Sequence, residues 1–156
     1  MTPPTDPAKK ILHIDMDNTL VDFRSGLARV PQPILDEYGD DPDDIPGIFS
    51  LMDPMPHAIE SYERLNEIFE VYILSTAPWN NPSAWSDKLL WVKRYLGHVN
   101  EKRLTLSHNK HLAIGDFLVD DRDKHGAEHF RGEWIRIGTD EFPTWKEVVP
   151  YLEARA

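Results

Sequence analysis

Two aspartates near the start of the chain, Asp15 and Asp17, have the spacing of a catalytic carboxylate pair. They directly follow a short apolar run at residues 11–14, and open α/β sheets bind their ligands at the carboxyl ends of such strands. One carboxylate of the pair can attack phosphorus as a nucleophile while the other moves a proton. Asp and Asn are also common turn residues after strands, so this interpretation needs support from elsewhere in the chain.

A hydroxyl and an amine are available to hold phosphate oxygens. Thr76 follows the apolar run 71–74, and Lys110 precedes the apolar run 117–119. The hydroxyl can bond a phosphate oxygen, and the ammonium would offset the charge of the phosphoryl oxygens and of the carboxylates. Taken singly, a Thr after a strand is usually a helix cap and a Lys is usually a solvated surface residue.

An acidic pair, Asp120 and Asp121, follows the run 117–119. Adjacent acids just past a buried strand repel each other unless a cation is near. Mg²⁺ can be that cation, because it prefers oxygen ligands in near-octahedral geometry. The alternative is an exposed loop in which Arg122 is the ion-pair partner.

The elements that must position these residues are short apolar runs separated by helical patterns. Apolar residues at helical spacing predict helices near residues 58–69, 82–96 and 145–152, and Trp85 is expected in the core. Strands alternating with helices predict an α/β domain, Rossmann-like and three-layered, with a five-stranded parallel sheet. The predicted strands are residues 11–14, 71–74, 103–106, 117–119 and 134–137.

The chain is expected to form one domain, residues 11–156, after a flexible leader at residues 1–10. Residues 22–54 are too long for a simple βα loop, so we expect a small inserted cap that includes a helix near residues 23–38. The acidic residues at 40–44 would disfavour polyanions at the entrance of a site.

Composition excludes several classes of protein. The net charge of −10 argues against a protein that follows a nucleic-acid backbone. The absence of cysteine excludes disulfides, thiolate metal sites and a cysteine nucleophile. The sequence contains no membrane-spanning stretch or signal-peptide pattern, so a soluble cytoplasmic protein is expected, in an oligomeric state that the sequence does not indicate.

The four motifs occur in the order, and at the strand ends, that are typical of the haloacid dehalogenase-like (HAD) phosphatases, which the chain resembles over roughly residues 11–139. Within that superfamily the chain most resembles the 5'(3')-deoxyribonucleotidases. The matching segments are DMDNTLVDF, MDPMPHA, STAPW, WVKRYLG, LSHNK and GDFLVDDR.

The resemblance implies a magnesium-dependent phosphohydrolase that dephosphorylates nucleoside monophosphates through an aspartyl-phosphate. Asp15 would be the nucleophile and a metal ligand, and Asp17 would be the acid/base and bind the metal through its carbonyl. One or both of Asp120 and Asp121 would complete the metal site. The remaining implied roles are phosphate binding by Thr76 and Lys110 and base binding by Phe23.

The cap segment is shorter than this family usually carries, and Phe49 is the one candidate within it for a further base-stacking aromatic. Trp79 is another candidate to line the pocket. The motifs encode phosphoryl chemistry and not the leaving group, so a sugar-phosphate or phosphoprotein phosphatase stays open, as does a non-catalytic phosphate-binding module. A phosphoacceptor receiver domain is set aside, because there the acidic pair follows the first strand.

Overall fold

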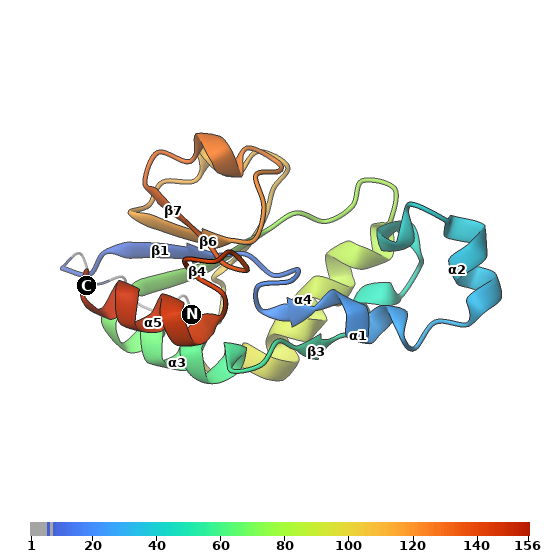
Figure 1. Cartoon of the computed structure of the whole chain (residues 1–156), viewed down its shortest axis with the longest axis horizontal. Coiled ribbons are helices and arrows are strands. Elements are labelled where there is room, and N and C mark those ends of the chain that lie inside the picture. Colours follow the sequence, from blue (N-terminus) through green and yellow to red (C-terminus); the bar gives the residue numbers. More distant parts are fainter. Residues whose placement is uncertain (1–5, 7) are drawn as a thin grey trace.

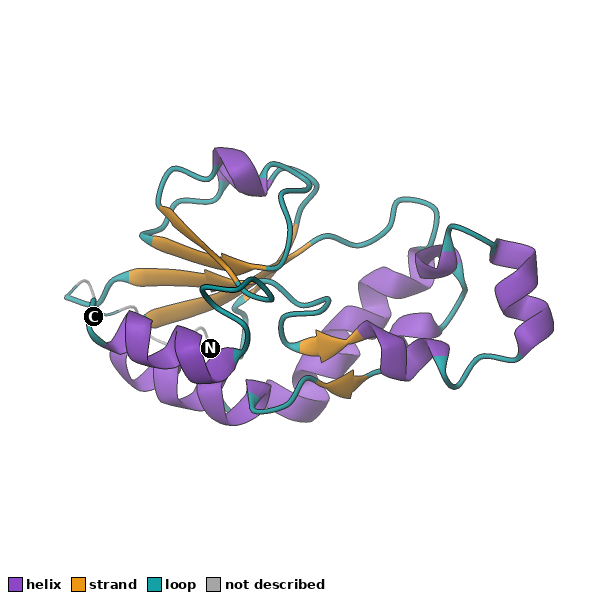
Figure 2. Cartoon of the chain, in the orientation of Figure 1, coloured by secondary structure: helices purple, strands orange, loops and turns teal. Residues whose placement is uncertain are grey.

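The computed structural model describes residue 6 and residues 8–156. Its centre is a five-stranded sheet in the order β5-β4-β1-β6-β7, with all neighbouring strands parallel (Figures 1 and 2). The predicted α/β class and parallel sheet are confirmed. The strands are β1 (Ile11–Ile14), β4 (Glu70–Ser75), β5 (Leu104–Leu106), β6 (Phe117–Asp120) and β7 (Glu133–Arg136).

Strand β1 lies at the middle of the sheet, and three of its four side chains, those of Leu12, His13 and Ile14, are buried. Ile14 pairs in register with Ile73 of β4 and Val119 of β6, and all three are fully buried. The backbone N–H of Asp15 continues the ladder by donating to the carbonyl of Val119. The end of β1 therefore lies between the ends of β4 and β6, where the predicted site residues follow.

Two helices, α3 (Ala58–Ile68) and α5 (Trp145–Glu153), cover one face of the sheet (green and red in Figure 1). Their buried side chains belong to the main core. The other face has a thinner cover, formed by η4 (Ala127–His129) and its flanking loops, and a smaller core cluster that contains Leu118 and Phe130.

Helix α4 (Pro82–Leu96) begins beside the inserted segment that follows β1 and runs back towards the sheet (Figure 1). The expectation that Trp85 belongs to the core is wrong: Trp85 is 39% exposed and Leu89 is 43% exposed. Both possible stripes of this helix are apolar, and packing against η2 (Ile48–Ser50) and β5 decides which one turns inward. The buried residues are Ala84, Lys88, Trp91, Val92 and Leu96.

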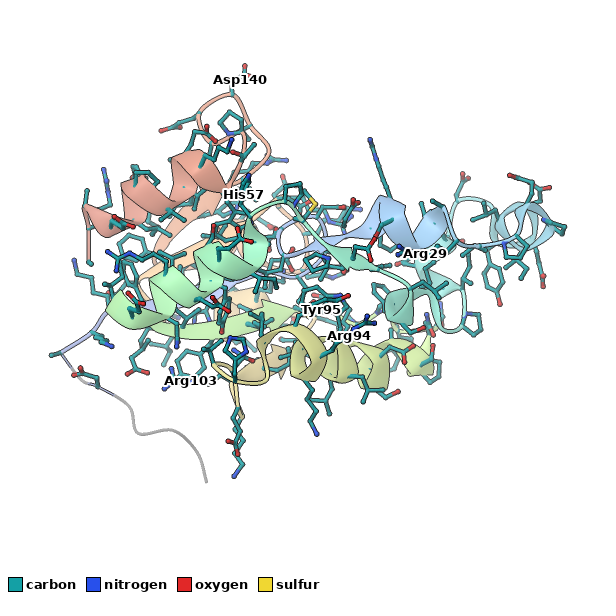
Figure 3. All side chains as sticks on the ribbon, turned by 90° about the horizontal axis from the view of Figure 1, so that it is seen from below. Arg29, His57, Arg94, Tyr95, Arg103 and Asp140 are labelled. Atoms are coloured by element: carbon teal, nitrogen blue, oxygen red, sulfur yellow. The ribbon has the colours of Figure 1, made fainter. Side chains whose placement is uncertain are left out.

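The segment predicted as a cap forms short elements beside α4, away from the main sheet (Figure 2). A single helix over residues 23–38 is wrong, because Pro31 is extended (ψ 141°) and lacks the N–H that a helix interior needs. Arg29, which lies just before Pro31 and is labelled in Figure 3, donates hydrogen bonds to the Leu51 carbonyl and to the carboxylate of Asp53, near the end of the segment. The elements are β2 (Val21–Asp22), α1 (Phe23–Leu27), α2 (Gln32–Tyr38), η1 (Pro42–Asp44), η2 and β3 (Asp53–Pro54).

Most of the predicted leader, residues 1–5 and residue 7, lies outside the described residues. Of the leader residues that are described, Asp6 donates its backbone N–H to Glu70. Among the described residues, none of the helices has the length and apolar character needed to cross a membrane.

Candidate active site

The carboxyl edge of the sheet brings together three charged residues that are far apart in sequence. Asp15 follows β1, Asp120 ends β6, and Lys110 opens the short helix η3 (Lys110–Leu112). Lys110 is 4% exposed, and its Nζ donates to Oδ1 of Asp15 at 2.8 Å and to Oδ2 of Asp120 at 2.6 Å. Burial disfavours the charged form of Lys110, but the two carboxylates outweigh this effect and raise its pKa.

Asp121 joins Asp15 and Asp120 in a cluster whose ligand oxygens all lie within 4.8 Å of one another. Burial, reinforced by the charge of Asp15, raises the pKa of Asp120 to about 8 and that of Asp121 to about 6. Oδ1 of Asp121 is buried and has no hydrogen-bond partner among the described residues. A crowded set of oxygen ligands with an unsatisfied atom fits a hard divalent cation.

The loop after β1 folds back tightly and directs Asp17 towards the same region. The Met16 carbonyl accepts the N–H groups of Thr19, Leu20 and Val21. Asn18 supports this turn with a positive φ of 58°, a conformation that Asn tolerates better than most residues. The D-x-D-N-T sequence is therefore suited to the turn that places two carboxylates on one cavity.

A second buried lysine, Lys88 of α4, was not predicted from the sequence as a site residue. Its side chain is 0% exposed, and Nζ donates to Oδ2 of Asp17 at 3.0 Å and to the hydroxyl of Ser75 at 2.8 Å. The same Nζ lies 4.6 Å from the ring centroid of Phe49. The signal in the sequence was a lysine between Ala84 and Trp91 at helical spacing, on the face that proves to be buried.

Burial raises the pKa of Asp17, and the negative charge of Asp15 adds to the rise, while Lys88 opposes it. Because Oδ2 accepts the bond from Lys88, Oδ1 remains as the atom that can carry a proton. The two members of the carboxylate pair therefore differ in their lysine partners, Lys110 for Asp15 and Lys88 for Asp17.

Thr76 lies on the same cavity as Asp15, and its hydroxyl donates to the carbonyl of Ser107 at 2.7 Å. This hydroxyl must exchange that bond in order to donate to a phosphate oxygen. Phe23 is placed differently: its ring packs edge-to-face against Phe49, with centroids 5.9 Å apart, and it is not among the residues that line the cavity.

The cavity has a volume of about 280 Å³. Its wall includes Asp15, Asp17, Asp120, Thr76 and Lys110, so five of the predicted residues border one space. Trp79, a candidate from the sequence to line the pocket, also borders the cavity, as do Asp41, Asp43 and Asp44 from the acidic stretch expected at the entrance. The sequence did not predict the rest of the wall, which is formed by Pro78, Asn80, His108, Arg122, Lys124 and His125.

Comparison with known proteins agrees with this geometry. Residues 43–142 match the family described as 5' nucleotidase, deoxy (pyrimidine), cytosolic type C protein. A protein of Vibrio phage KVP40, whose name places it among the 5'(3')-deoxyribonucleotidases, is 55% identical over 144 residues, covering 92% of this chain and 85% of the relative. The human 5'(3')-deoxyribonucleotidase, cytosolic type, is 25% identical over 87% of this chain and 77% of its own length.

Two further comparisons, one of sequence and one of structure, are consistent with these matches. A protein of Staphylococcus epidermidis, named in the same way as the phage relative, is 34% identical over 58% of this chain, and the match spans about half (49%) of that relative. A haloacid dehalogenase-like family hydrolase from Streptococcus pneumoniae shares the fold with a TM-score of 0.57 and 16% identity, covering 92% of this chain and 90% of that chain. At this identity the structural match speaks for the fold alone.

Proposed function

The chain belongs to the 5'(3')-deoxyribonucleotidase family of HAD-type phosphoric monoester hydrolases, and on this premise we propose that it is a magnesium-dependent enzyme that dephosphorylates nucleoside monophosphates. The observation that carries the proposal is the position of Lys110 between the carboxylates of Asp15 and Asp120, on a cavity that Asp17 and Thr76 also line. The substrate is a small nucleotide phosphate, with one phosphate group at the sheet edge.

Asp15 attacks the phosphorus and forms an aspartyl-phosphate. Three observations support this role of Asp15. It lies at the end of the central strand, it is buried, and its Oδ1 accepts a hydrogen bond from the ammonium of Lys110. Lys110 and the hydroxyl of Thr76 then bind the phosphoryl oxygens, whose charge the ammonium offsets in the transition state.

Asp17 donates a proton from Oδ1 to the leaving oxygen of the nucleoside and afterwards takes a proton from the attacking water. The raised pKa of Asp17 supports this role, because a general acid must hold its proton near neutral pH. Lys88, which also donates to the hydroxyl of Ser75, holds the opposite oxygen and so fixes the direction in which the proton is delivered.

Asp15, Asp120 and Asp121, with the backbone carbonyl of Asp17, would hold the magnesium ion. When bound, the ion screens the repulsion between the carboxylates and the phosphate and polarises the phosphoryl group. The unpartnered Oδ1 of Asp121 and the raised pKa values of Asp120 and Asp121 support a cation at this place.

Residues 22–54 act as a small cap on a single domain of residues 11–156, with Phe23 near the base of the cap. We place the enzyme in the cytoplasm, with support from the cytosolic type of its human relative.

Phosphate release from a panel of substrates tests the proposal: deoxynucleoside and ribonucleoside monophosphates, sugar phosphates and a phosphopeptide. Deoxynucleoside monophosphates should be the best substrates, and EDTA should lower the rate at least about a hundredfold, with recovery on adding Mg²⁺. Equal rates with and without EDTA would remove the metal from the mechanism. A higher kcat/KM for sugar phosphates would overturn the substrate class.

A further inference from the structure

The outer part of the catalytic cavity carries an exposed aromatic ring whose role nothing above explains. Trp79 is 79% exposed, although it lies on a short connection between β4 and α4 and borders the same cavity as Asp15. An aromatic ring that is both exposed and placed on a cavity wall offers a flat surface on which a ligand in that cavity can stack. Among the described residues, three aromatic side chains line this cavity: Trp79 and the two histidines, His108 and His125.

The aromatic residues of the cap are not available for the same task. Phe49 is 2% exposed, because it packs against Phe23 and lies over the ammonium of Lys88. What the cap contributes to the cavity wall instead is the carboxylates of Asp41, Asp43 and Asp44. A flat nucleobase therefore finds a stacking surface on the Trp79 connection and not on the cap.

The backbone that carries Trp79 is held firmly. Asn81 is 1% exposed, and its side-chain amide donates to the carbonyls of Asp43 at 2.8 Å and Ile45 at 3.0 Å. The ring of Trp79 also packs edge-to-face on His108, with centroids 5.8 Å apart. A ring held in this way loses little conformational entropy when a base stacks on it, so most of the stacking energy would appear as affinity.

We propose that Trp79 is the specificity-determining residue that binds the nucleobase of the substrate by stacking, in place of Phe23. This inference rests on the proposed function, because the base must arrive attached to a phosphate held at Lys110. Trp79 is three residues after Thr76, so one connection holds both ends of the substrate: the phosphate near the strand end and the base at the exposed ring. Stacking on an aromatic ring is available to every nucleobase, so the residue selects nucleotides over base-free phosphates rather than one base over another.

The test compares kcat/KM for thymidine 5'-monophosphate with kcat/KM for 2-deoxyribose 5-phosphate, which lacks the base. The ratio of the two should fall about 10- to 100-fold in Trp79→Ala, because removing a stacking ring usually costs this much affinity per base. Trp79→Phe should keep most of the ratio, because a smaller ring still stacks.

Trp85→Ala is the matched control. Trp85 is a neighbouring, partly exposed tryptophan that also contacts His108, but it lines a separate groove with Leu89 and Leu104. Its loss should leave the ratio unchanged. An unchanged ratio in Trp79→Ala, or an equal fall in Trp85→Ala, would overturn the inference. If the wild type released phosphate from neither compound, the proposed function itself would fail, so the two failures are distinguishable.

A binding measurement checks the same point without turnover. Thymidine 5'-monophosphate titrated into the Asp15→Asn protein should quench tryptophan fluorescence, because the base lies on an indole. The quenching should be lost in the Asp15→Asn/Trp79→Phe protein, while calorimetry still detects the ligand. Equal quenching in both proteins would place the base elsewhere.

Discussion

Two nearly fully buried lysines bind Asp15 and Asp17, the proposed catalytic pair, and their surroundings are opposite in charge balance. At the sheet edge, Lys110 is shared by Asp15 and Asp120, and Asp121 lies beside them, so one ammonium faces three carboxylates. At the junction of α4 with the cap, Lys88 faces one carboxylate, that of Asp17, together with a hydroxyl and an aromatic ring.

The difference in charge indicates different tasks. The sheet edge has an excess of negative charge that a divalent cation and a phosphate-binding lysine can share. The junction is balanced without a metal ion, because the ammonium of Lys88 offsets the one carboxylate, so the expected task of this lysine is to hold the proposed acid/base residue, Asp17, in position. The region that needs a ligand to complete it contains Asp15, Lys110 and Asp120. In the self-contained region, α4 supplies the lysine and the cap supplies the aromatic ring that accompany Asp17.

The largest expected effect is at the sheet edge. Asp15→Asn should lower kcat by roughly 10⁴-fold or more, because it removes the nucleophile while keeping the shape of the side chain. Asp140→Asn is the matched control, since Asp140 is exposed and lies at the outer tip of its loop (Figure 3). Steady-state phosphate release measures both. A rate near that of the wild type in correctly folded Asp15→Asn would end the assignment.

At the junction, Lys88→Met should act on proton delivery. We expect kcat for a nucleoside monophosphate to fall about 10²- to 10³-fold but that for p-nitrophenyl phosphate only a few-fold, because a good leaving group needs little help from a general acid. Equal losses on both substrates would show that Lys88 has only a structural role.

The same substitution tests the charge balance at the junction through stability. Lys88→Met should lower the free energy of unfolding by about 3 kcal/mol, because it leaves Asp17 without its cation. Urea denaturation of Lys88→Met, Asp17→Asn and the double variant measures the coupling. The double variant should recover part of the loss, and strictly additive losses would contradict the pairing.

The pH dependence of stability that Asp120 causes tests whether the sheet edge carries an excess of negative charge. Its pKa is raised from 3.8 to about 8, so between these values the folded protein binds more protons at this group than the unfolded chain does. Its contribution to stability therefore falls as pH rises through that window. Without metal, the Tm of Asp120→Asn minus that of the wild type should increase by a few degrees from pH 5 to pH 8, since 1 kcal/mol corresponds to roughly 2–4 °C.

Added Mg²⁺ should reverse this trend at pH 8, because the wild type has the carboxylate that binds it and the variant does not. Thermal unfolding in EDTA and in Mg²⁺ provides both measurements. A Tm difference that did not change with pH would contradict the negative excess at the sheet edge.

The smallest effects come from two tryptophans that each donate one buried hydrogen bond. Trp91 donates to the Met52 carbonyl beside the cap, and Trp145 donates to the Thr19 carbonyl in the loop after β1. Replacing either with Phe should cost about 1 kcal/mol of stability. Trp145→Phe should mainly lower kcat, and Trp91→Phe should mainly raise KM, each by less than about tenfold, because 1.4 kcal/mol is tenfold. The same kinetic pattern in both variants would show that the two regions are not separate.

Short apolar runs and the polar residues after them were sufficient to predict the sheet. Residues 11–14 coincide with β1, and each of the other four predicted strands is displaced by at most one residue at either end. The three central strands, β1, β4 and β6, are largely buried, so their apolar composition distinguishes them from their surroundings. The edge strands β5 and β7 are only partly buried, but each still contains apolar residues. Parallel strands also bring their carboxyl ends to one edge, so Asp15, Asp120 and Asp121 were expected at the same edge of the sheet. Their proximity depends on β1 and β6 being neighbours, which the structure shows.

By itself, then, the sequence determined the α/β sheet and the residues at its carboxyl edge. The reason is that short apolar runs mark the strands, and the residues that follow each run lie at the end of that strand. Only the tertiary structure decided which stripe of α4 turns inward, that Lys88 reaches Asp17, and that Trp79 rather than Phe23 borders the cavity. Each of these depends on how the cap packs against α4. A helix with two apolar stripes does not encode its own rotation, and only the neighbouring segments fix it.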